Sequence, residues 1–251
     1  MMKPNKIQDL LQRLESDILR GEYAIRSRFP SEREISARYG VSRITTRDAL
    51  SRLCQMGLLR KAPQSGTFVN DYLTETSIDL LVRIMQSTDT MDTAALVSLL
   101  DFRRVNEVYA ARKAALEITR QGIDEIEGWV RRGTEGMHDI AVLCDCDYEV
   151  HRAVIRHSGN IVLALLFNSF KAVYRHYTAF YYTLPSSAEN TFRHYARLAA
   201  ALAARDADYA GHIMDTLLLE AENAVKDAIS YNGEDRIDLG AFRKTTASSS
   251  S

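Results

Sequence analysis

Apolar residues recur at helical spacing over the first 20 residues of the chain. Between residues 5 and 20 they fall at every third or fourth position: Ile7, Leu10, Leu11, Leu14, Ile18 and Leu19. This period places them on one face of an α-helix, and Gly21 directly after them favours the end of that helix. The sequence therefore predicts a helix over residues 5–20 with one buried face.

Two shorter helices and a hairpin are expected next. Ser31 and Glu34 have the spacing of a capping box, which predicts a helix over residues 32–39. Ser42 is the expected cap of a third helix that ends near residue 56. Residues 58–60 and 67–70 then flank a Gln64-Ser65-Gly66 tip, a pattern typical of a β-hairpin. Three helices followed by a hairpin make a winged helix-turn-helix.

From residue 77 onward the apolar spacing is helical almost throughout. Helices are predicted over residues 77–87, 92–119, 122–134, 138–157, 160–183, 187–205 and 206–230. The fold class is therefore mainly α, an N-terminal winged helix-turn-helix plus an all-α C-terminal bundle of six to seven helices. The expected division is a winged domain over 1–72, a linker over 73–77, a helical domain over 78–231 and a disordered tail over 232–251.

Charge is unevenly divided between these two domains. Residues 1–70 hold 13 Lys or Arg against 7 Asp or Glu, whereas the remainder holds 19 against 26, for a net charge of -1. A basic module joined to an acidic one suggests that the first module binds a polyanion. A chance fluctuation of composition is the competing explanation.

Cysteine usage and hydropathy point to the cell interior. The three cysteines, Cys54, Cys144 and Cys146, do not form a disulfide framework. No N-terminal segment resembles a signal peptide, and no stretch reaches the about 18 apolar residues of a membrane span. The expectation is a soluble, reduced, cytoplasmic protein without a membrane partner.

The start of the third helix carries side chains suited to DNA. In a helix-turn-helix this end of the second helix enters the major groove, and here it carries Ser42, Arg43, Thr45, Thr46 and Arg47. Arginine can fork onto guanine, and hydroxyl groups can bind phosphates. Arg33, on the preceding helix, is placed to reach the same groove. Solvated arginines are the alternative, but the capping box, glycine turn and hairpin together favour DNA.

Several motifs resemble the GntR superfamily of regulators. They are Phe-Pro-Ser-Glu-Arg-Glu at 29–34, Gly-Val-Ser-Arg at 40–43, Thr-Arg-Asp-Ala-Leu at 46–50 and Gly-Thr-Phe-Val at 66–69. The helical region, with Asp-Phe-Arg-Arg at 101–104 and Asp-Tyr-Glu-Val-His at 147–151, is similar to the FadR branch. The resemblance implies a homodimer on a palindromic double-stranded operator, with Arg33, Arg43 and Arg47 contacting bases and phosphates.

The same resemblance implies a role for the wing tip. Gln64 and Gly66 would touch the minor groove, and Ser42 and Thr45 would add hydroxyl contacts. The family often has a basic residue or a glycine at the tip, where this chain has Pro63-Gln64-Ser65-Gly66. The recognition helix is therefore the firmer part of the expectation.

Asp147 and His151 lie one helical turn apart on the apolar face of the predicted helix 138–157. A carboxylate and an imidazole that point inward can bind a divalent metal. A buried Asp–His hydrogen bond that only orders the core is the competing interpretation.

The FadR branch implies a divalent metal of the Zn, Ni or Mn type, with His194 near the third ligand position. The fourth ligand would fall near Thr216; His212, one turn earlier, or an open position are the alternatives. The effector would be a small organic acid held with metal assistance, or, as in the fatty-acyl-CoA-responsive subgroup, an acyl thioester. Arg103 and Arg104 are candidates to hold an effector carboxylate or phosphate. The competing interpretation is that they form a surface salt bridge with Glu107.

The helical domain would thus bind effector and dimerise, and effector would shift the relative placement of two DNA-binding heads. Two rival classes remain. A metal-dependent hydrolase could use Asp147, His151 and His194 to activate water, but only Glu149, on another helix face, offers a nearby base, so no enzyme is expected. A purely architectural DNA binder would have apolar residues at 147, 151 and 194.

Overall fold

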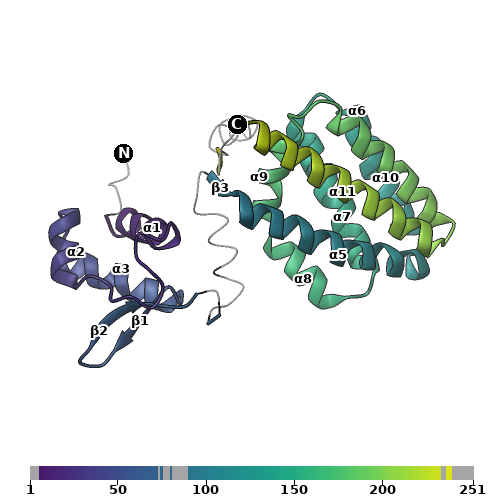
Figure 1. The fold of residues 1–251 in the computed structure, drawn as a ribbon. Helices are drawn as coiled ribbons and strands as arrows, with labels where there is room; N and C mark the ends of the chain where they lie inside the picture. Colours follow the sequence, from purple (N-terminus) through teal and green to yellow (C-terminus); the bar gives the residue numbers. More distant parts are fainter. Residues whose placement is uncertain (1–5, 73, 76–79, 81–89, 233–235, 239–251) are drawn as a thin grey trace. The chain divides into compact units, whose positions relative to one another are not determined.

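The structure is a computed structural model that describes all residues except 1–5, 73, 76–79, 81–89, 233–235 and 239–251 (Figure 1). The chain divides into two compact units, residues 1–88 and 89–251, and each is described by itself. Most of the predicted linker over 73–77 and the whole of the predicted helix 77–87 except Leu80 lie outside the described residues.

The first unit is a winged helix-turn-helix, as the sequence predicts. Its elements are α1 (Lys6–Leu19), α2 (Glu32–Tyr39), α3 (Arg43–Gln55), β1 (Leu59–Ala62) and β2 (Gly66–Val69). The two strands pair antiparallel, with Leu59 opposite Val69 and Ala62 opposite Gly66. This hairpin is the wing that follows the three helices.

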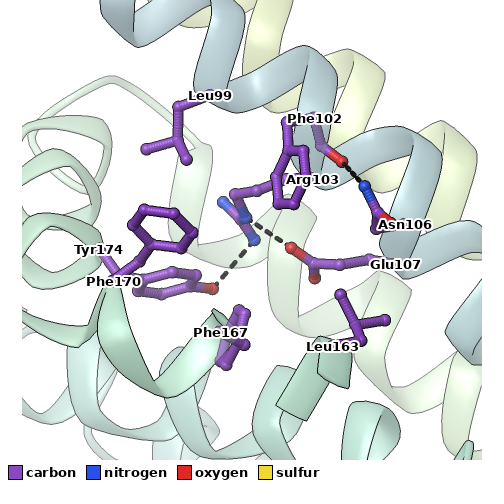
Figure 2. Close-up of a pocket in the computed structure, with 9 residues that line it drawn as sticks. All are labelled: Leu99, Phe102, Arg103, Asn106, Glu107, Leu163, Phe167, Phe170 and Tyr174. Atoms are coloured by element: carbon purple, nitrogen blue, oxygen red, sulfur yellow. Dashed lines mark hydrogen bonds and ion pairs between the residues drawn. The ribbon is translucent and has the colours of Figure 1, made fainter. Parts of the chain in front are cut away.

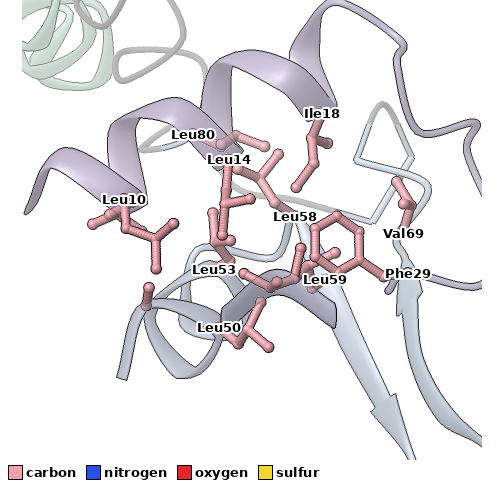
Figure 3. Packing of buried hydrophobic residues seen from close by; sticks show 13 residues of the cluster. Leu10, Leu14, Ile18, Phe29, Leu50, Leu53, Leu58, Leu59, Val69 and Leu80 are labelled. Carbon is pink, nitrogen blue, oxygen red and sulfur yellow. The ribbon is translucent and has the colours of Figure 1, made fainter. Parts of the chain in front are cut away.

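A single apolar cluster holds the three helices and the wing together (Figure 3). Leu14 and Ile18 from α1, Ile35 from α2 and Leu53 from α3 are completely buried in it. Each such side chain contributes roughly 1.5–3 kcal/mol of apolar transfer free energy. The periodic face of residues 5–20 is therefore the face that α1 buries.

Local signals fix both ends of α2. The Ser31 hydroxyl accepts a hydrogen bond from the Glu34 amide at 3.3 Å, and the Glu34 carboxylate accepts one from the Ser31 amide at 2.8 Å. The Ser31 hydroxyl also donates to the Glu34 carboxylate at 2.6 Å, and this hydrogen bond, followed by the one from the Ser31 amide, lowers the pKa of Glu34. At the other end Gly40 adopts a left-handed φ of 63°, which glycine tolerates best. The turn that positions α3 is thus encoded locally.

The second unit is an all-α bundle. Its helices are α5 (Thr93–Glu117), α6 (Arg120–Glu135), α7 (Ile140–His157), α8 (Ile161–Ser169), α9 (Lys171–Tyr181), α10 (Ser187–Ala203) and α11 (Ala207–Asn232). The long helices α5 and α11 pack along each other, and α6 packs on α7 and α10 (Figure 1). At Gly133 a Cβ atom would lie 1.9 Å from a ring carbon of Phe192, so glycine permits the close approach of α6 and α10.

The single helix predicted over residues 160–183 is wrong, because the chain forms α8 and α9 with a break at Phe170. The Phe170 amide donates to the Phe167 carbonyl at 3.1 Å, which tightens the last turn of α8. The Phe170 carbonyl then accepts from the Tyr174 amide and starts a new helical ladder. Neither glycine nor proline marks this break in the sequence.

Two short strands join the ends of the second unit. β3 (Thr90–Asp92) pairs antiparallel with β4 (Arg236–Asp238). The pairing was not foreseen, since β4 lies inside the tail that the sequence predicts to be disordered; the remainder of that tail after Asn232 lies outside the described residues. Among the helices of the described residues, none is long and apolar enough to cross a membrane.

Candidate nucleic-acid interface and sensor core

The start of α3 presents a polar, solvent-facing edge. Ser42 caps the helix, and its hydroxyl accepts from the Thr45 amide at 3.1 Å. The Ser42 and Arg43 side chains are exposed and Thr45 is half-buried. Arg43 makes no ion pair with any of the described residues. A helix N-terminus with free N–H groups and an unpaired guanidinium is suited to bind an anionic backbone.

Thr46 requires a correction to the expected set of DNA contacts. It is 0 % exposed, and its hydroxyl donates to the Ser42 carbonyl at 3.2 Å. The side chain therefore faces the core of the unit, together with Ala49 and Leu50 one turn later. It cannot reach a duplex without unpacking the helix.

Arg33 and Arg47 are exposed beside this edge, but Arg47 is already paired. Its guanidinium donates to the Glu32 carboxylate, with Nε–Oε2 and Nη2–Oε2 distances of 3.2 Å. Both side chains remain partly open to water, so the pair is an exposed one of small net stability. A forked phosphate contact that uses Nε and Nη2 of Arg47 has to replace Glu32.

The wing tip is exposed and conformationally demanding. Gln64 has a left-handed φ of 62°, and Gly66 has a φ of 112°. A Cβ atom at Gly66 would also lie 3.2 Å from Nε of Arg28. The backbone of Arg28 pairs with that of Phe68 in β2 through an isolated β-bridge, so Arg28 is an exposed basic residue at the wing.

Sequence reasoning missed both Arg28 and Ile44. Ile44 is 81 % exposed on α3, directly after Arg43. A large apolar residue among the polar residues of a helix start was the available signal for Ile44. The position of Arg28 against the wing depends on tertiary structure and leaves no pattern in the sequence.

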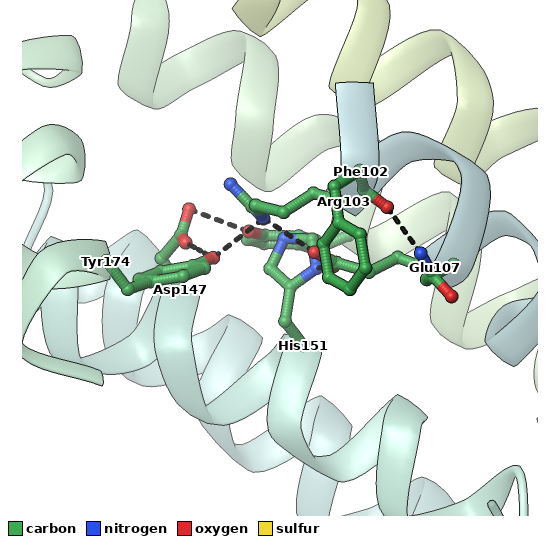
Figure 4. Close-up of polar contacts among 8 residues, drawn as sticks. Phe102, Arg103, Glu107, Asp147, His151 and Tyr174 are labelled. Carbon is green, nitrogen blue, oxygen red and sulfur yellow. Dashed lines mark hydrogen bonds and ion pairs between the residues drawn. The ribbon is translucent and has the colours of Figure 1, made fainter. Parts of the chain in front are cut away.

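Asp147, on α7, is buried in the second unit, and three tyrosine hydroxyls form a cage around its carboxylate; Figure 4 shows the first of them, Tyr174, beside Asp147. Tyr195 donates to Oδ2 at 2.7 Å, Tyr182 donates to the same oxygen at 2.5 Å, and Tyr174 donates to Oδ1. Burial raises the pKa values of Tyr182 and Tyr195 well above that of a free tyrosine, and the nearby negative charge of Asp147 adds to this effect. The cage therefore holds neutral phenols around one buried carboxylate.

Arg103, Glu107 and His151 form a second buried group next to this cage (Figure 4). Nε of Arg103 donates to Glu107 Oε1 at 2.6 Å, and Nη2 donates to the Tyr174 hydroxyl at 3.1 Å (Figure 2). Nδ1 of His151 contacts the other carboxylate oxygen of Glu107. Burial alone would raise the pKa of Glu107, but the charges of Arg103 and His151 outweigh burial and lower this pKa to about 2.

The predicted partner of Arg103 is correct, but its setting is not. The expected salt bridge with Glu107 was a surface one, whereas both side chains are at most 4 % exposed. Arg104 points elsewhere and pairs with Asp215 on α11 at 2.6 Å, partly exposed. The two arginines thus do not converge on one ligand.

The donor set does not fit a metal ion in this arrangement. His194 uses Nε2 to contact Glu220 at 3.0 Å and lines an open groove with Arg193 between α10 and α11. His212 is exposed on α11, where it stacks on Tyr209. Within the described part of the chain, no three His, Cys, Asp or Glu side chains are grouped to hold a metal.

Cys144 and Cys146 belong to no group of three metal-ligating side chains among the described residues. Both are buried and carry no disulfide. Burial raises the pKa of Cys144 to about 12 and also raises that of Cys146. Buried thiols with raised pKa values are chemically inert, as structural cysteines are.

Two families match this chain in succession. Residues 6–69 match "Bacterial regulatory proteins, gntR family", and residues 98–220 match the FCD domain. The HTH-type transcriptional regulator Mce2R of Mycobacterium tuberculosis is 28% identical over 199 residues, covering 79% of this chain and 82% of that protein. A fatty acid metabolism regulator protein of Edwardsiella ictaluri is 28% identical over 184 residues, covering 71% and 73%.

Among solved structures, Lar, which controls expression of the Listeria monocytogenes agr system, is similar in fold. It has a TM-score of 0.59 at 15% identity and covers 90% of this chain and 99% of its own. The winged unit and the helical unit thus each match a domain of known regulators, in the same order along the chain. The chain belongs to the GntR superfamily of transcription regulators, in its FadR branch, and is a ligand-responsive DNA-binding regulator built from a GntR domain and an FCD domain.

Proposed function

We propose that this regulator binds a palindromic operator as a homodimer, with the start of α3 in the major groove of each half-site. The observation that carries this proposal is the exposed edge at Ser42–Arg47, where an unpaired arginine sits on a capped helix N-terminus. Recognition helices of this type read successive major grooves about 34 Å apart. Two-fold symmetry of the protein then matches two-fold symmetry of the operator.

Each proposed contact has a distinct chemical role. Arg43 forks onto a guanine, and Arg33 and Arg47 bind bases or phosphates from either side. Ser42 and Thr45 add hydroxyl contacts to phosphates. Ile44 packs on the methyl group of a thymine. Gln64 and Gly66 approach the minor groove from the wing; Thr46 is left out because it is buried.

Exposed apolar side chains support the proposal of a homodimer. On α5 they recur at helical spacing at Phe102, Val105, Tyr109 and Leu116. On α8 the outward residues Ile161, Val162 and Leu165 are exposed while the inward Leu163 and Phe167 are buried. A helix that is apolar all round is normally covered by protein. A second copy of the FCD domain on this face would cover it and join the two DNA-binding heads.

The FCD domain is proposed to bind the effector in its polar core, near Arg103 rather than Arg104. A metal ion is not part of the proposal. Both carboxylate oxygens of Asp147 already accept hydrogen bonds from tyrosines, and the His194 side chain contacts Glu220. Catalysis is not proposed either. Glu149, which the sequence offers as a general base for hydrolysis, pairs with Arg152.

The experiment that tests this function is a salt-controlled gel-shift titration against an operator selected from random duplexes. Arg43→Ala should lose specific binding, since a forked arginine–guanine contact is worth about 1–3 kcal/mol per half-site. Arg52→Ala, at the other end of the same helix, is the matched control and should bind as the parent does. Equal affinity of Arg43→Ala and the parent at fixed salt would refute the proposed interface.

A further inference from the structure

The segment that precedes α2 runs along the wing as a third, short strand. The Phe29 amide donates to the Thr67 carbonyl at 2.8 Å, and Arg28 lies opposite Phe68 through an isolated β-bridge. Successive residues of an extended strand point to opposite faces. Because Phe29 is buried in the apolar cluster (Figure 3), Arg28 points to the outer, solvent-facing side of the wing.

The Arg28 side chain reaches along this outer face to the tip of the wing. A Cβ atom at Gly66 would lie 3.2 Å from Nε and 3.5 Å from Nη2 of Arg28. Apart from the chain neighbours of Gly66, the atoms nearest to that position all belong to the Arg28 guanidinium. The guanidinium therefore occupies the space beside the tip that a side chain at position 66 would take.

Arg28 supplies the positive charge that the tip itself lacks. The tip residues, Pro63 to Gly66, include no charged side chain. Arg28 is exposed and has no ion-pair partner among the residues that the structure describes. Two arginines nearby are engaged: Arg26 pairs with Asp71 at 2.9 Å, and Arg60 lies over the Phe68 ring, 5.2 Å from its centroid. Arg28 is thus available to a partner that approaches the tip.

The charge of Arg28 is also felt at the start of α2. The pKa of Glu34 is lowered first by its hydrogen bonds with Ser31 and, to a smaller extent, by the positive charges of Arg33 and Arg28. Arg28 and Arg33 therefore both lie near Glu34, on the side of the unit where the helix-turn-helix begins. A duplex bound at that edge would meet the Arg28 guanidinium as well.

The chemistry of the minor groove decides which base pairs a guanidinium accepts. A guanidinium has hydrogen-bond donors and no acceptor. The floor of the groove presents only acceptors at A·T pairs, whereas a G·C pair adds the 2-amino donor of guanine. Runs of A·T pairs also narrow the groove and deepen its negative potential, which attracts arginine. A guanidinium that enters the groove with the wing tip would therefore favour A·T pairs.

We propose that Arg28 is the base-reading residue of the wing and selects A·T pairs in the minor groove next to each half-site. Its guanidinium, seated against Gly66, enters the groove with the tip and donates to N3 of adenine or O2 of thymine. This inference rests on the proposed DNA interface and adds a specificity determinant to it. The operator then has a sequence preference outside the pairs that α3 reads.

Three versions of the operator test this preference. They differ only in about three base pairs on either side of each half-site, which are A·T, G·C or inosine·C. Inosine lacks the 2-amino group of guanine, so inosine·C keeps the major-groove pattern of G·C and presents only acceptors in the minor groove. In anisotropy titrations the protein should bind the A·T and inosine·C versions alike and the G·C version at least about tenfold more weakly. Equal affinity for all three, or inosine·C behaving as G·C, would overturn the proposal.

Two variants assign the preference to one side chain. Arg28→Ala should bind the three versions alike, because the donor that distinguishes them is gone. Arg26→Ala removes the same charge two residues away, where the guanidinium pairs with Asp71, and should keep the preference. A variant that only loosened the wing would weaken all three complexes by one factor, so an unchanged preference in Arg28→Ala would refute the role of Arg28. Circular dichroism of both variants establishes that the fold is retained.

Arg43→Ala, titrated at low salt on the same duplexes, separates this inference from the proposed function. It should weaken all three complexes by a common factor and leave the A·T preference unchanged. Equal affinity of Arg43→Ala and the parent would count against the α3 interface. Weaker binding by Arg43→Ala, together with a retained preference in Arg28→Ala, would count against Arg28 alone.

Discussion

Glu32 competes with DNA for Arg47, and its removal should therefore strengthen operator binding. In the free protein the Arg47 guanidinium lies 3.2 Å from the Glu32 carboxylate, so a phosphate that is to take over the Nε and Nη2 donors must break this pair. An exposed pair of this kind contributes roughly 0.2–1 kcal/mol. Glu32→Gln removes that cost, and because 1.4 kcal/mol is a factor of ten, the affinity should rise about 1.4- to 5-fold for each half-site of the proposed operator.

Salt dependence supplies an independent readout of the same event. If each Arg47 engages one phosphate more fully, the plot of log affinity against log salt should become steeper by up to about 0.9 per half-site. Gel-shift or anisotropy titrations at several salt concentrations, from about 50 to about 200 mM, would measure this change of slope.

Glu22→Gln is the matched control, since it removes one exposed carboxylate outside the helix-turn-helix edge. It alters the net charge by the same amount and should leave the affinity nearly unchanged. The reasoning is refuted if Glu32→Gln binds the operator no better than the parent, or if Glu22→Gln gains as much. Thermal unfolding should accompany the titrations, because Glu32 also lies in the first turn of α2, where a carboxylate is stabilising.

Three further predictions concern the FCD domain. Tyr195→Phe removes one hydrogen bond to the buried Asp147 and should lower the free energy of unfolding by about 1.5–3 kcal/mol in urea titrations, an unchanged midpoint being the contrary result. Because the folded-state pKa of Glu107 is lowered from 4.5 to about 2, its stabilising contribution is complete above pH 4.5 and is lost as the pH falls toward 2. Urea titrations across this window should show the free energy of unfolding decline, and Glu107→Gln should make this decline smaller. Gly133→Ala places a methyl group into the ring of Phe192 and should lower the melting temperature through an overpacking cost of about 1–3 kcal/mol; retention of the parental melting temperature would contradict the close approach of α6 and α10.

The sequence predicts those elements whose signals are local. Ser31, Glu34 and Gly40 lie within ten residues of one another and specify α2 by caps alone. The prediction that Thr46 contacts DNA is wrong because its side chain is buried. Its spacing of three and four residues from Ala49 and Leu50 already places it on the buried face of the helix. The exposed part of the α3 edge follows from the same helical period.

The sensor core could not be predicted in the same way, because its contacts join distant segments. Asp147 meets Tyr174, Tyr182 and Tyr195, which lie 27 to 48 residues away on other elements. Helical spacing places Asp147 on an inward face but does not say which partners it meets. His194 likewise has a ligand-like position in the chain, yet the packing of α10 on α11 turns it toward Glu220.

The tyrosine cage has a consequence for how the FCD domain can deform. One carboxylate ties together side chains from α7, from α9 and its C-terminal end, and from α10, so relative sliding of these helices would strand a desolvated anion. They form a rigid block. α8 supplies no side chain to this cage, has an exposed outer face and is bounded by the turns at Ser158–Asn160 and Phe170. We therefore expect α8 to shift more readily than the helices that the Asp147 carboxylate holds together.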